Sequence, residues 1–329
     1  MHSTYQSPAW LFGAHSQTIF PAVFAPKPAV LYARHRLDLS DNDFVDIDFL
    51  DALPIAGDNR PFVALFHGLE GNSSSHYALA LMAQLARSGL RGAVVHWRGC
   101  SGVPNRLPRS YHSGESNDID SALHFLADRL GAATPLFAMG VSLGGNALIK
   151  WLGEEGRQTN IVTGACAVSA PHDLAAGARM LASGISRLYT HNFMSTLKAK
   201  SLQKLEQFAM PYSVQEVKAC NNFHSFDDVV TARVHGFQSA QDYWSRSSCK
   251  QFMATIKIPT LVINAINDPF LPPAALASAD EVSNQVTLEY PRAGGHVGFL
   301  SSPVPGSHSW IPHRTLDFFG LFQGKQANG

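Results

Sequence analysis

Apolar residues recur along the chain in a pattern typical of alternating strands and helices. Runs that are almost continuously apolar, as in strands covered on both faces, lie at 62–66, 92–97, 136–139 and 161–169, and a strand pattern returns at 260–264 and 286–290. Between the first three runs, apolar positions at helical spacing predict helices at 77–90 and 116–130. This alternation predicts an α/β fold with a mostly parallel, doubly wound sheet.

Two stretches before these runs have a different pattern. Residues 31–39 and 44–51 alternate apolar and polar side chains, which predicts antiparallel edge strands. Residues 1–29 combine aromatic residues with prolines. We therefore expect an irregular N-terminal arm that packs its rings against the remaining chain, because exposed rings are costly.

The strand pattern is interrupted between residues 172 and 250. Helix-like stretches without a convincing strand occur there, at 174–189, 193–208, 213–219 and 226–246. We expect this insertion to form a helical cap over the carboxyl edge of the sheet. A final amphipathic helix is predicted at 310–322, and the whole chain, 1–329, is expected to form a single domain.

The composition agrees with such a domain and argues against some partners. Of 329 residues, 45% are hydrophobic and 15% are charged, which leaves enough apolar side chains for a sizeable core. Lys plus Arg and Asp plus Glu both number 25, so no basic excess indicates a nucleic-acid partner. No feature of the sequence indicates an oligomeric state.

The cysteines and the apolar runs bear on the cellular setting. Four cysteines without C-x-x-C spacing make a reduced, cytoplasmic location the simplest interpretation. Residues 1–8 lack the layout of a secretory signal. No apolar run approaches the roughly 20 residues that span a bilayer, so we expect no integral membrane segment.

A G-x-S-x-G motif stands between a predicted strand and a predicted helix. It reads Gly140-Val141-Ser142-Leu143-Gly144, after the apolar run 136–139 and before the helical stretch 145–152. A nucleophile elbow requires this context, because its tight turn lifts the serine out of the sheet and leaves room only for small flanking residues. Ser142 is therefore the candidate nucleophile, with the positive end of a helix directly behind it.

A serine nucleophile needs a base, and the base needs an orienting acid. Asp268 follows the predicted strand 260–264, and His296 follows the strand 286–290 between glycines, so both belong at the carboxyl edge of the sheet. The order Ser, Asp, His is the one in which the partners of this motif occur. Asp173, which follows an earlier strand, is the alternative acid or else the N-cap of the first insertion helix.

Two backbone N–H groups are expected to form an oxyanion hole. One belongs to Leu143, the residue after the nucleophile, and the other comes from a loop that follows an early strand of the sheet. That loop reads His67-Gly68-Leu69-Glu70-Gly71, with glycines that keep its backbone open. We expect the Leu69 N–H to be the second donor.

A set of short motifs, taken in order, resembles one known family. The motifs are His67-Gly68-Leu69-Glu70-Gly71, Trp97-Arg98-Gly99-Cys100-Ser101-Gly102, Tyr111-His112-Ser113-Gly114, Gly140-Val141-Ser142-Leu143-Gly144-Gly145-Asn146, Asn267-Asp268-Pro269-Phe270 and Gly294-Gly295-His296-Val297-Gly298-Phe299. From about His15 to Trp310 the chain resembles the YheT-like branch of the α/β-hydrolases, the α/β-hydrolase 4 family. The resemblance implies a serine esterase or lipase that acts on carboxylic esters, with Ser142, Asp268 and His296 as its triad. Trp97 stands where the family leads us to expect phenylalanine, and it keeps an aromatic ring there.

Two further groups of polar residues have more than one interpretation. Arg98 can pin the long loop that carries His112, or it can meet a polar group of the substrate. His224, Asp227 and Asp228 can act as helix caps and ion pairs or as metal ligands. Because they lack a ligand spacing such as H-E-x-x-H, we prefer caps and ion pairs, and we expect no metal and no cofactor.

These features predict a serine carboxylic-ester hydrolase that works through an acyl-enzyme. The arm and the cap are rich in Phe, Leu, Met and Tyr, and they are expected to wall a pocket for a short- to medium-chain acyl ester. Two alternatives stay open. One is an acyltransferase or ester synthase that uses the same triad, and the other is a non-catalytic protein that keeps the fold as a scaffold.

Overall fold

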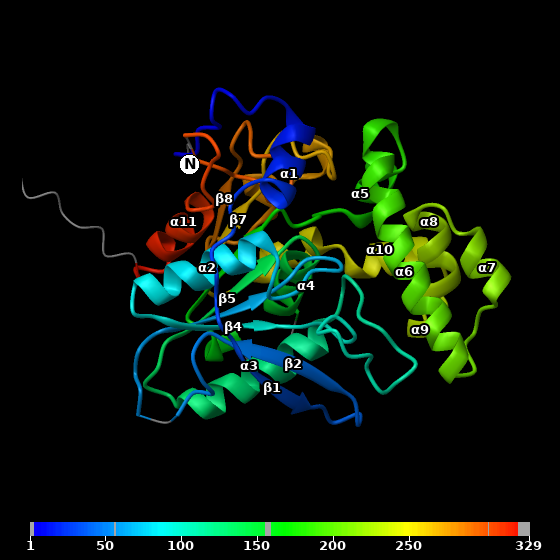
Figure 1. The fold of residues 1–329 in the computed structure, drawn as a ribbon, viewed down its shortest axis with the longest axis horizontal. Coiled ribbons are helices and arrows are strands. Elements are labelled where there is room, and N and C mark those ends of the chain that lie inside the picture. Colours follow the sequence, from blue (N-terminus) through cyan, green and yellow to red (C-terminus); the bar gives the residue numbers. More distant parts are fainter. Residues whose placement is uncertain (1–2, 56, 155–158, 302, 322–329) are drawn as a thin grey trace, which may run out of the picture.

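An eight-stranded sheet forms the centre of the computed structural model, which describes residues 3–55, 57–154, 159–301 and 303–321 (Figure 1). In spatial order its strands are β1 (Ala33–Asp38), β2 (Phe44–Phe49), β4 (Arg91–Val95), β3 (Phe62–Phe66), β5 (Leu136–Val141), β6 (Gly164–Val168), β7 (Thr260–Ile263) and β8 (Val286–Glu289). β1 pairs with β2, and β2 with β4, in antiparallel fashion; the other neighbours are parallel. The predicted α/β fold with a mostly parallel, doubly wound sheet is confirmed.

The continuously apolar strands divide their side chains between two cores. In β3, Phe62 and Phe66 belong to the cluster on one face of the sheet, whereas Val63 and Leu65 belong to the cluster on the other. Successive side chains of a strand point to opposite faces, so a strand covered on both sides has to be apolar throughout. Strands β3 to β6 are buried along their whole length.

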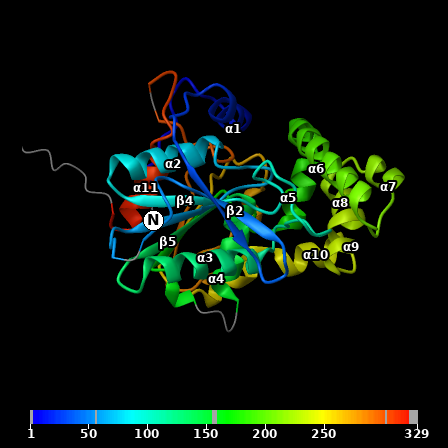
Figure 2. The same ribbon diagram turned by 60° about the horizontal axis from the view of Figure 1, so that its bottom comes forward.

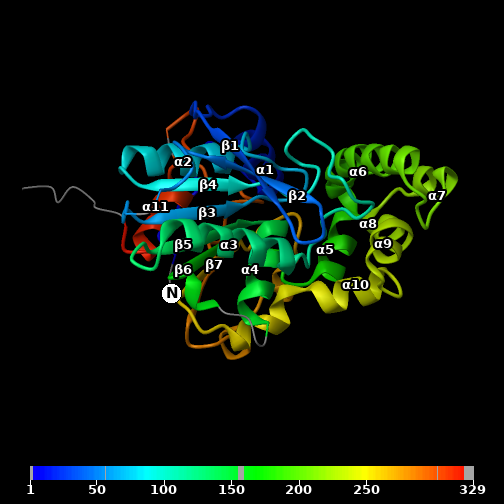
Figure 3. The same ribbon diagram turned by 90° about the horizontal axis from the view of Figure 1, so that it is seen from below.

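Helices cover both faces of this sheet, as Figures 2 and 3 show. One face carries α2 (His76–Arg87) and α11 (Trp310–Phe318), which pack on each other. The opposite face carries α3 (Ser116–Leu130) and α4 (Leu143–Gly153). The predicted last helix is shorter than 310–322, because Gly320 takes a φ of 69° just after it, a common way for a helix to end. Position 322 lies outside the described residues.

β2 is not the edge strand that its alternating pattern predicted. It lies between β1 and β4, and all of its residues are buried. Its polar side chains, Asp46 and Asp48, form two-point ion pairs with Arg36 and Arg34 of β1. An alternation of apolar and charged residues occurs both in strands whose charges face water and in strands whose charges pair with arginines. The pattern alone therefore does not distinguish an edge strand from a buried one.

The helices between β6 and β7 lie together beyond the carboxyl ends of the parallel strands (Figures 1 and 3). They are α5 (Leu174–Leu181), α6 (Arg187–Gln207), α7 (Val214–Ala219), α8 (Phe223–Phe226), the π-helix η3 (Asp227–Ala232), α9 (Arg233–His235) and α10 (Ala240–Ser247), with 3-10 turns at Gly184–Ser186 and Cys249–Thr255. Residues 172–250, all of which are described, are termed the helical cap below. Neither α6 nor any other helix of the described ranges is long and apolar enough to cross a membrane.

Two glycines set helix boundaries in the cap that the sequence pattern did not show. Gly184, with a φ of 53°, separates α5 from α6, so the predicted break near residue 190 does not occur. Gly236, with a φ of 72°, ends α9 and divides the predicted helix 226–246. A separate apolar cluster holds the helices together and consists of Met194, Tyr212, Val217, Cys220, Phe226 and Val230.

The N-terminal arm contains a helix, α1 (Ala14–Val23), where an irregular segment was predicted. Prolines within and after the helix concealed it, since they are rare inside helices. Trp10 and Phe20 pack edge to face beside Leu300. Phe12 and Phe24, by contrast, are 77% and 66% exposed, so the expectation that the arm buries all its rings is wrong for these two.

Candidate active site

Ser142 lies in a sharp turn between β5 and α4. Its φ of 53° is rare for a residue other than glycine, and such strain is typical of a nucleophile elbow. Close backbone contacts explain the neighbouring glycines. A Cβ on Gly140 would lie 2.4 Å from the Gly144 carbonyl oxygen, and one on Gly144 would lie 2.3 Å from that of Phe66. The turn therefore holds Ser142 above the sheet edge, at the N-terminus of α4.

The side chains of Ser142, His296 and Asp268 form one hydrogen-bonded row. His296 Nε2 lies 2.9 Å from Ser142 Oγ, and His296 Nδ1 lies 2.8 Å from Asp268 Oδ2. A carboxylate only accepts hydrogen bonds, so Nδ1 carries a proton and Nε2 can accept the proton of the serine hydroxyl. The structure thus brings together the three residues that the sequence analysis placed at one sheet edge.

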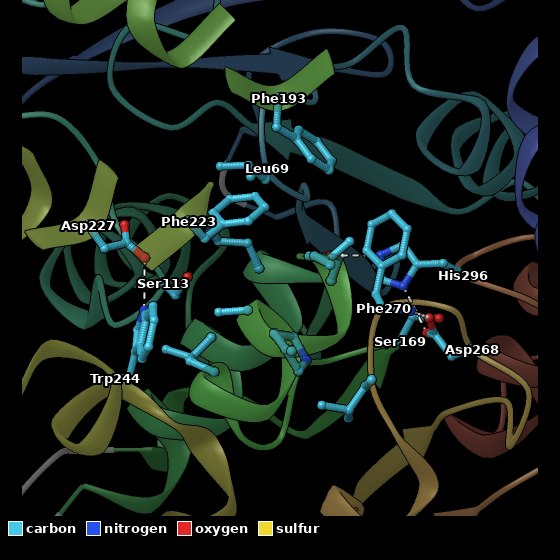
Figure 4. A pocket seen from close by; sticks show the side chains of 18 of the residues that line it. Leu69, Ser113, Ser169, Phe193, Phe223, Asp227, Trp244, Asp268, Phe270 and His296 are labelled. Carbon is cyan, nitrogen blue, oxygen red and sulfur yellow. Dashed lines mark hydrogen bonds and ion pairs between the residues drawn. The ribbon is translucent and has the colours of Figure 1, made fainter. Parts of the chain in front are cut away.

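The turn after β7 holds both Asp268 and the imidazole. Asp268 Oδ1 accepts the Phe270 N–H at 2.8 Å, and the Asp268 N–H donates to the Ala265 carbonyl at 3.1 Å. The Phe270 ring stacks on His296 with a centroid distance of 4.0 Å and an interplanar angle of 12° (Figure 4). This ring contact, which the sequence analysis missed, restricts the imidazole from the side.

Asp173, the alternative acid, has a different place in the structure. It is the N-cap of α5, where its side chain accepts the Ala176 N–H at 2.9 Å. Within the described ranges, no hydrogen bond or ion pair joins it to His296. Of the two candidate acids, Asp268 is the one that contacts the imidazole.

Helix α1 holds the loop that carries His296, a function that the sequence analysis did not anticipate. Thr18 Oγ1 accepts the His296 N–H at 2.9 Å, and Gln17 Oε1 accepts the Gly294 N–H at 2.9 Å. The same Gln17 oxygen accepts a hydrogen bond from Asn267 Nδ2 at 2.8 Å, which links the Asp268 and His296 loops. The sequence signal that could have revealed this contact is the polar stretch His15-Ser16-Gln17-Thr18, which lies within an arm rich in aromatic residues and prolines.

The loop after β3 packs directly against the candidate nucleophile. A Cβ on Gly68 would lie 3.1 Å from the Ser142 Cβ. His67 fixes the loop from inside the core, where burial lowers the pKa of its imidazole to about 3. The neutral ring donates from Nδ1 to the Gly68 carbonyl at 2.8 Å and accepts the Trp97 N–H on Nε2 at 3.2 Å.

Two backbone N–H groups beside Ser142 are available as donors. Those of Leu69 and Leu143 form no hydrogen bond within the described chain, and both residues line the cavity that contains Ser142. Leu143 is the first residue of α4, so its N–H has no partner within the helix. The neighbouring Glu70 and Gly71 N–H groups, in contrast, are both hydrogen-bonded.

Glu70 connects this loop to the helical cap. The Tyr111 hydroxyl accepts the Glu70 N–H and donates to Glu70 Oε1, both at 2.8 Å. Burial raises the pKa of Tyr111 well above its usual value, so the hydroxyl keeps its proton. Lys200 of α6 places its Nζ 2.8 Å from the same carboxylate oxygen. An ion pair therefore joins the cap to the residue next to Leu69.

A cavity lies between the sheet edge and the cap, and Ser142, Asp268 and His296 line it. Most of the remaining wall is apolar and comes from the cap and the β7 turn: Leu174, Leu181, Phe193, Phe223, Phe270 and Leu271. Figure 4 shows Phe193 and Phe223 around the cavity, with His296 on one side of it. Such a wall suits a hydrocarbon group.

Arg98 pins its own loop. Its side chain is buried and forms ion pairs with Asp118 at 2.7 Å and with Asp43 at 3.0 Å. Asn105 Nδ2 donates to the same Asp43 carboxylate at 2.7 Å and also to the loop carbonyls of Leu107 and Arg109. Of the two interpretations of Arg98, the structure supports the pinning of the loop.

Asp227 and Asp228 have separate hydrogen-bond partners within the helical cap. Among the described residues, no three His, Cys, Asp or Glu side chains are grouped so that they could hold a metal ion. Asp228 accepts the N–H of Ala240, the first residue of α10, at 3.0 Å. The interpretation as a helix cap holds for Asp228, whereas Asp227 accepts hydrogen bonds from Thr231 and Trp244.

Known proteins resemble this chain in sequence. A family model described as the alpha/beta hydrolase fold matches residues 61–303. YheT of Escherichia coli (strain K12), by its name a candidate esterase, is 36% identical over 310 residues, which cover 94% of this chain and 90% of that protein. Phospholipase ABHD3 of Mus musculus is 27% identical over 308 residues, which cover 92% of this chain and 74% of that protein.

A fungal enzyme and a solved structure are similar as well. Medium-chain fatty acid ethyl ester synthase/esterase 2 of Saccharomyces cerevisiae is 27% identical over 308 residues, which cover 86% of this chain and 65% of that protein. The esterase Pf2001 of Pyrococcus furiosus has a TM-score of 0.56 at 13% identity, over 89% of this chain and 93% of that one, a likeness of fold alone. The family model and the match to YheT together show that the chain belongs to the YheT-like branch of the α/β-hydrolases, a family of esterase and hydrolase enzymes.

Proposed function

We propose that this protein is a serine carboxylic-ester hydrolase. Ser142 attacks the ester carbonyl while His296 takes its proton, and Asp268 keeps the imidazole in the required tautomer. The observation that carries the proposal is the row of contacts from Ser142 Oγ to His296 at 2.9 Å and from His296 to Asp268 at 2.8 Å. The Leu69 and Leu143 N–H groups stabilise the oxyanion, the alcohol leaves with a proton from His296, and water releases the acyl group.

The proposed substrate is a short- to medium-chain acyl ester. The apolar wall of the cavity supports an acyl group, and the fungal relative is named for medium-chain fatty acid ethyl esters. In this proposal residues 1–329 act as one domain, in which the helical cap, 172–250, supplies much of the wall. The reaction uses amino-acid side chains and backbone N–H groups.

A panel of p-nitrophenyl esters that rises from acetyl to lauroyl tests the proposal. We expect turnover that peaks at short or medium chains and that falls about a millionfold in Ser142→Ala. Ser113→Ala is the matched control, because Ser113 lines the same cavity and its backbone hydrogen bonds to Tyr243 and Asn146 remain after the change. Hydrolysis that survives in Ser142→Ala would contradict the proposed nucleophile.

The two alternatives have separate tests. The fungal relative is named as a synthase as well as an esterase, which favours acyl transfer as the second candidate. Added ethanol should then divert the acyl group from free acid to ethyl ester. A fluorophosphonate probe should label Ser142 in either enzyme, and absence of both labelling and hydrolysis would indicate a non-catalytic scaffold.

A further inference from the structure

A second carboxylate, Asp227, faces the same cavity and has no part in the proposed reaction. It is the first residue of the π-helix η3 in the cap. It lines both the cavity that contains Ser142 and an adjoining cavity beside α6. Figure 4 shows Asp227 on the side of the cavity opposite His296 and Asp268.

The Asp227 carboxylate is buried without a cationic partner. The residue is 8% exposed, Oδ1 accepts the Thr231 hydroxyl at 2.7 Å, and Oδ2 accepts the Trp244 indole N–H at 2.8 Å. Within the described residues no Lys, Arg or His forms an ion pair with it; the His224 ring, which lies edge-on to Trp244, lowers the pKa of Asp227 through a weaker charge interaction at longer range. Burial raises the pKa of Asp227 to about 6, so the group still carries a charge at neutral pH.

A purely structural role does not require this charge. Trp244 needs an acceptor, and the Thr231 hydroxyl can either donate or accept. Asparagine would therefore satisfy both partners without the cost of burying an ion. The carboxylate has about four acceptor positions, of which these two neighbours occupy one on each oxygen. Acceptor capacity towards the cavity remains.

The surroundings of the carboxylate are aromatic. Phe223, Tyr243 and Trp244 line the cavity beside it. The Tyr243 hydroxyl already accepts a hydrogen bond from the Ser113 N–H at 2.8 Å. Asp227 is therefore the strong acceptor at this end of the cavity. Rings around an acceptor of this kind exclude water, and they also attract a protonated amine through their faces.

We propose that Asp227 binds a hydrogen-bond donor, either a hydroxyl or a protonated amine, on the part of the substrate remote from the scissile ester. This inference rests on the proposed esterase function, because it assigns the cavity around Ser142 to the substrate. The preferred substrate is then an ester that carries a hydrogen-bond donor at its remote end, with an apolar segment between this donor and the ester carbonyl. Asp227 then determines specificity and does not enter the chemical steps.

The experiment compares esters that differ only in their remote end. One series carries methyl, hydroxyl or amino groups at the far end of a hexanoyl chain with p-nitrophenol as leaving group. A second series places the same groups on the alcohol and keeps hexanoate as the acyl part. kcat/KM is measured for the wild-type protein, for Asp227→Asn and for the matched control Asp228→Asn, whose carboxylate binds the Ala240 N–H away from both cavities.

We expect the wild-type protein to prefer a donor-bearing ester of one series over its methyl counterpart. In Asp227→Asn the kcat/KM for that ester should fall roughly ten- to a hundredfold, as for a lost hydrogen bond to a charged group, with little change for the methyl ester. Asp228→Asn should leave kcat/KM unchanged for both the donor-bearing ester and the methyl ester. An equal loss for both esters, or a wild-type protein that does not prefer donors, would overturn the inference.

Two measurements keep the outcome interpretable. The wild-type preference needs no variant, so it decides the question even if Asp227→Asn fails to fold, which thermal unfolding would show. The methyl ester reports on the proposed function alone. If the wild-type protein does not hydrolyse it, or if Ser142→Ala still does, the esterase proposal fails; if it is hydrolysed normally without any preference for donors, only the Asp227 inference fails.

Discussion

The imidazole of His296 is held from three directions. Asp268 binds its Nδ1, the ring of Phe270 stacks on its face, and Thr18 accepts the backbone N–H of the residue. A base held in this way needs little reorganisation before it accepts the serine proton. The three supports differ in what they contribute, so their removal should have different kinetic effects.

Replacement of Asp268 by asparagine removes the acceptor that fixes the tautomer. The amide can hold the imidazole with its proton on the wrong nitrogen, so Nε2 no longer accepts the serine proton. We expect kcat to fall roughly 10⁴-fold with a small change in KM. Steady-state kinetics on the best p-nitrophenyl ester measure the effect.

The matched control for this change is Asp173→Asn. Its amide oxygen can still accept the Ala176 N–H at the start of α5, so both turnover and folding should be nearly normal. A large loss of turnover in Asp173→Asn together with normal turnover in Asp268→Asn would reverse the assignment of the acid.

A methyl group at Gly144 has no space. Its Cβ would lie 2.3 Å from the Phe66 carbonyl oxygen, and the contact is backbone against backbone. We expect Gly144→Ala to lower the free energy of unfolding by about 3 kcal/mol, as overpacking in a tight core does. Urea unfolding measures it. In the control Gly164→Ala the nearest atom is 3.4 Å away, and the loss should stay below about 1 kcal/mol; a similar loss in both variants would contradict the steric argument.

The sequence predicted that Ser142, Asp268 and His296 lie at one edge of the sheet, but it did not predict the contacts that support them. Ser142, Asp268 and His296 each follow a predicted strand, and parallel strands bring such positions to one edge. Phe270 and Thr18 support the imidazole through packing between segments far apart in the chain. Contacts of this kind have no local pattern, so they become visible only in the folded structure.

Helix α1 joins the two loops that carry Asp268 and His296, the proposed acid and base. Gln17 binds both Asn267 and Gly294, and a Cβ on Gly298 would lie 1.8 Å from the Gln17 carbonyl oxygen. The helix and the His296 loop are thus in direct backbone contact. The arm therefore supports the loops that carry Asp268 and His296, although none of its described residues lines the cavity around Ser142.

Thr18→Val tests this support of the base. The change leaves the His296 N–H without its acceptor while it keeps the shape of the side chain. We expect kcat to fall roughly ten- to a hundredfold through misplacement of the imidazole. KM should change little, because α1 does not line the cavity. Both values come from the same ester assay.

Thr134→Val is the control for the loss of a buried hydroxyl. Thr134 donates to the carbonyl of Leu130 four residues earlier, as Thr18 does to that of Ala14, and both threonines are buried. The two variants should lose similar stability, but only Thr18→Val should lose turnover. Equal kcat values in the two variants would show that the hydrogen bond from the His296 N–H to Thr18 does not affect turnover.

The elements of the sheet could be predicted because parallel strands covered on both faces are apolar throughout, as in β3 and β5. The errors have specific causes. Arginines of β1 cover the charges of β2, so its alternation did not mean exposure. In the cap, Gly184 and Gly236 interrupt the helices through left-handed φ values, which a hydrophobic pattern does not reveal.

Neutral histidines are distributed through the interior of the whole molecule. Burial lowers the pKa of His67, His76 and His112 to about 3 and that of His172 to about 4. In the unfolded chain each imidazole binds a proton below about pH 6.5. Above that pH the buried imidazoles are neutral in both states and do not lower the free energy of unfolding. Below it the unfolded chain binds protons that the folded protein does not, so the free energy of unfolding decreases progressively as the pH falls towards 4.

We therefore expect the protein to unfold more easily in mild acid. Each of the four imidazoles should cost roughly 1 kcal/mol of stability at about pH 5.5. Asp227, whose pKa burial raises, shifts stability in the opposite direction and offsets about one of them. Urea unfolding between about pH 7.5 and 5.5 measures the net decrease.

Variants of single histidines identify the source of this decrease. His172→Gln should make the pH dependence shallower, because one buried imidazole no longer has to stay neutral. A stability that is constant over this range in the wild-type protein would contradict the buried neutral state.

The ion pair between Lys200 and Glu70 has a consequence for protein engineering. A chimera that exchanges the insertion for that of a relative would alter the walls of the pocket and, at the same time, remove the counter-ion of the residue that follows Leu69. Selectivity and turnover would then change together, even though no reacting group had been exchanged. A graft that retains a lysine or arginine at position 200 should separate the two effects.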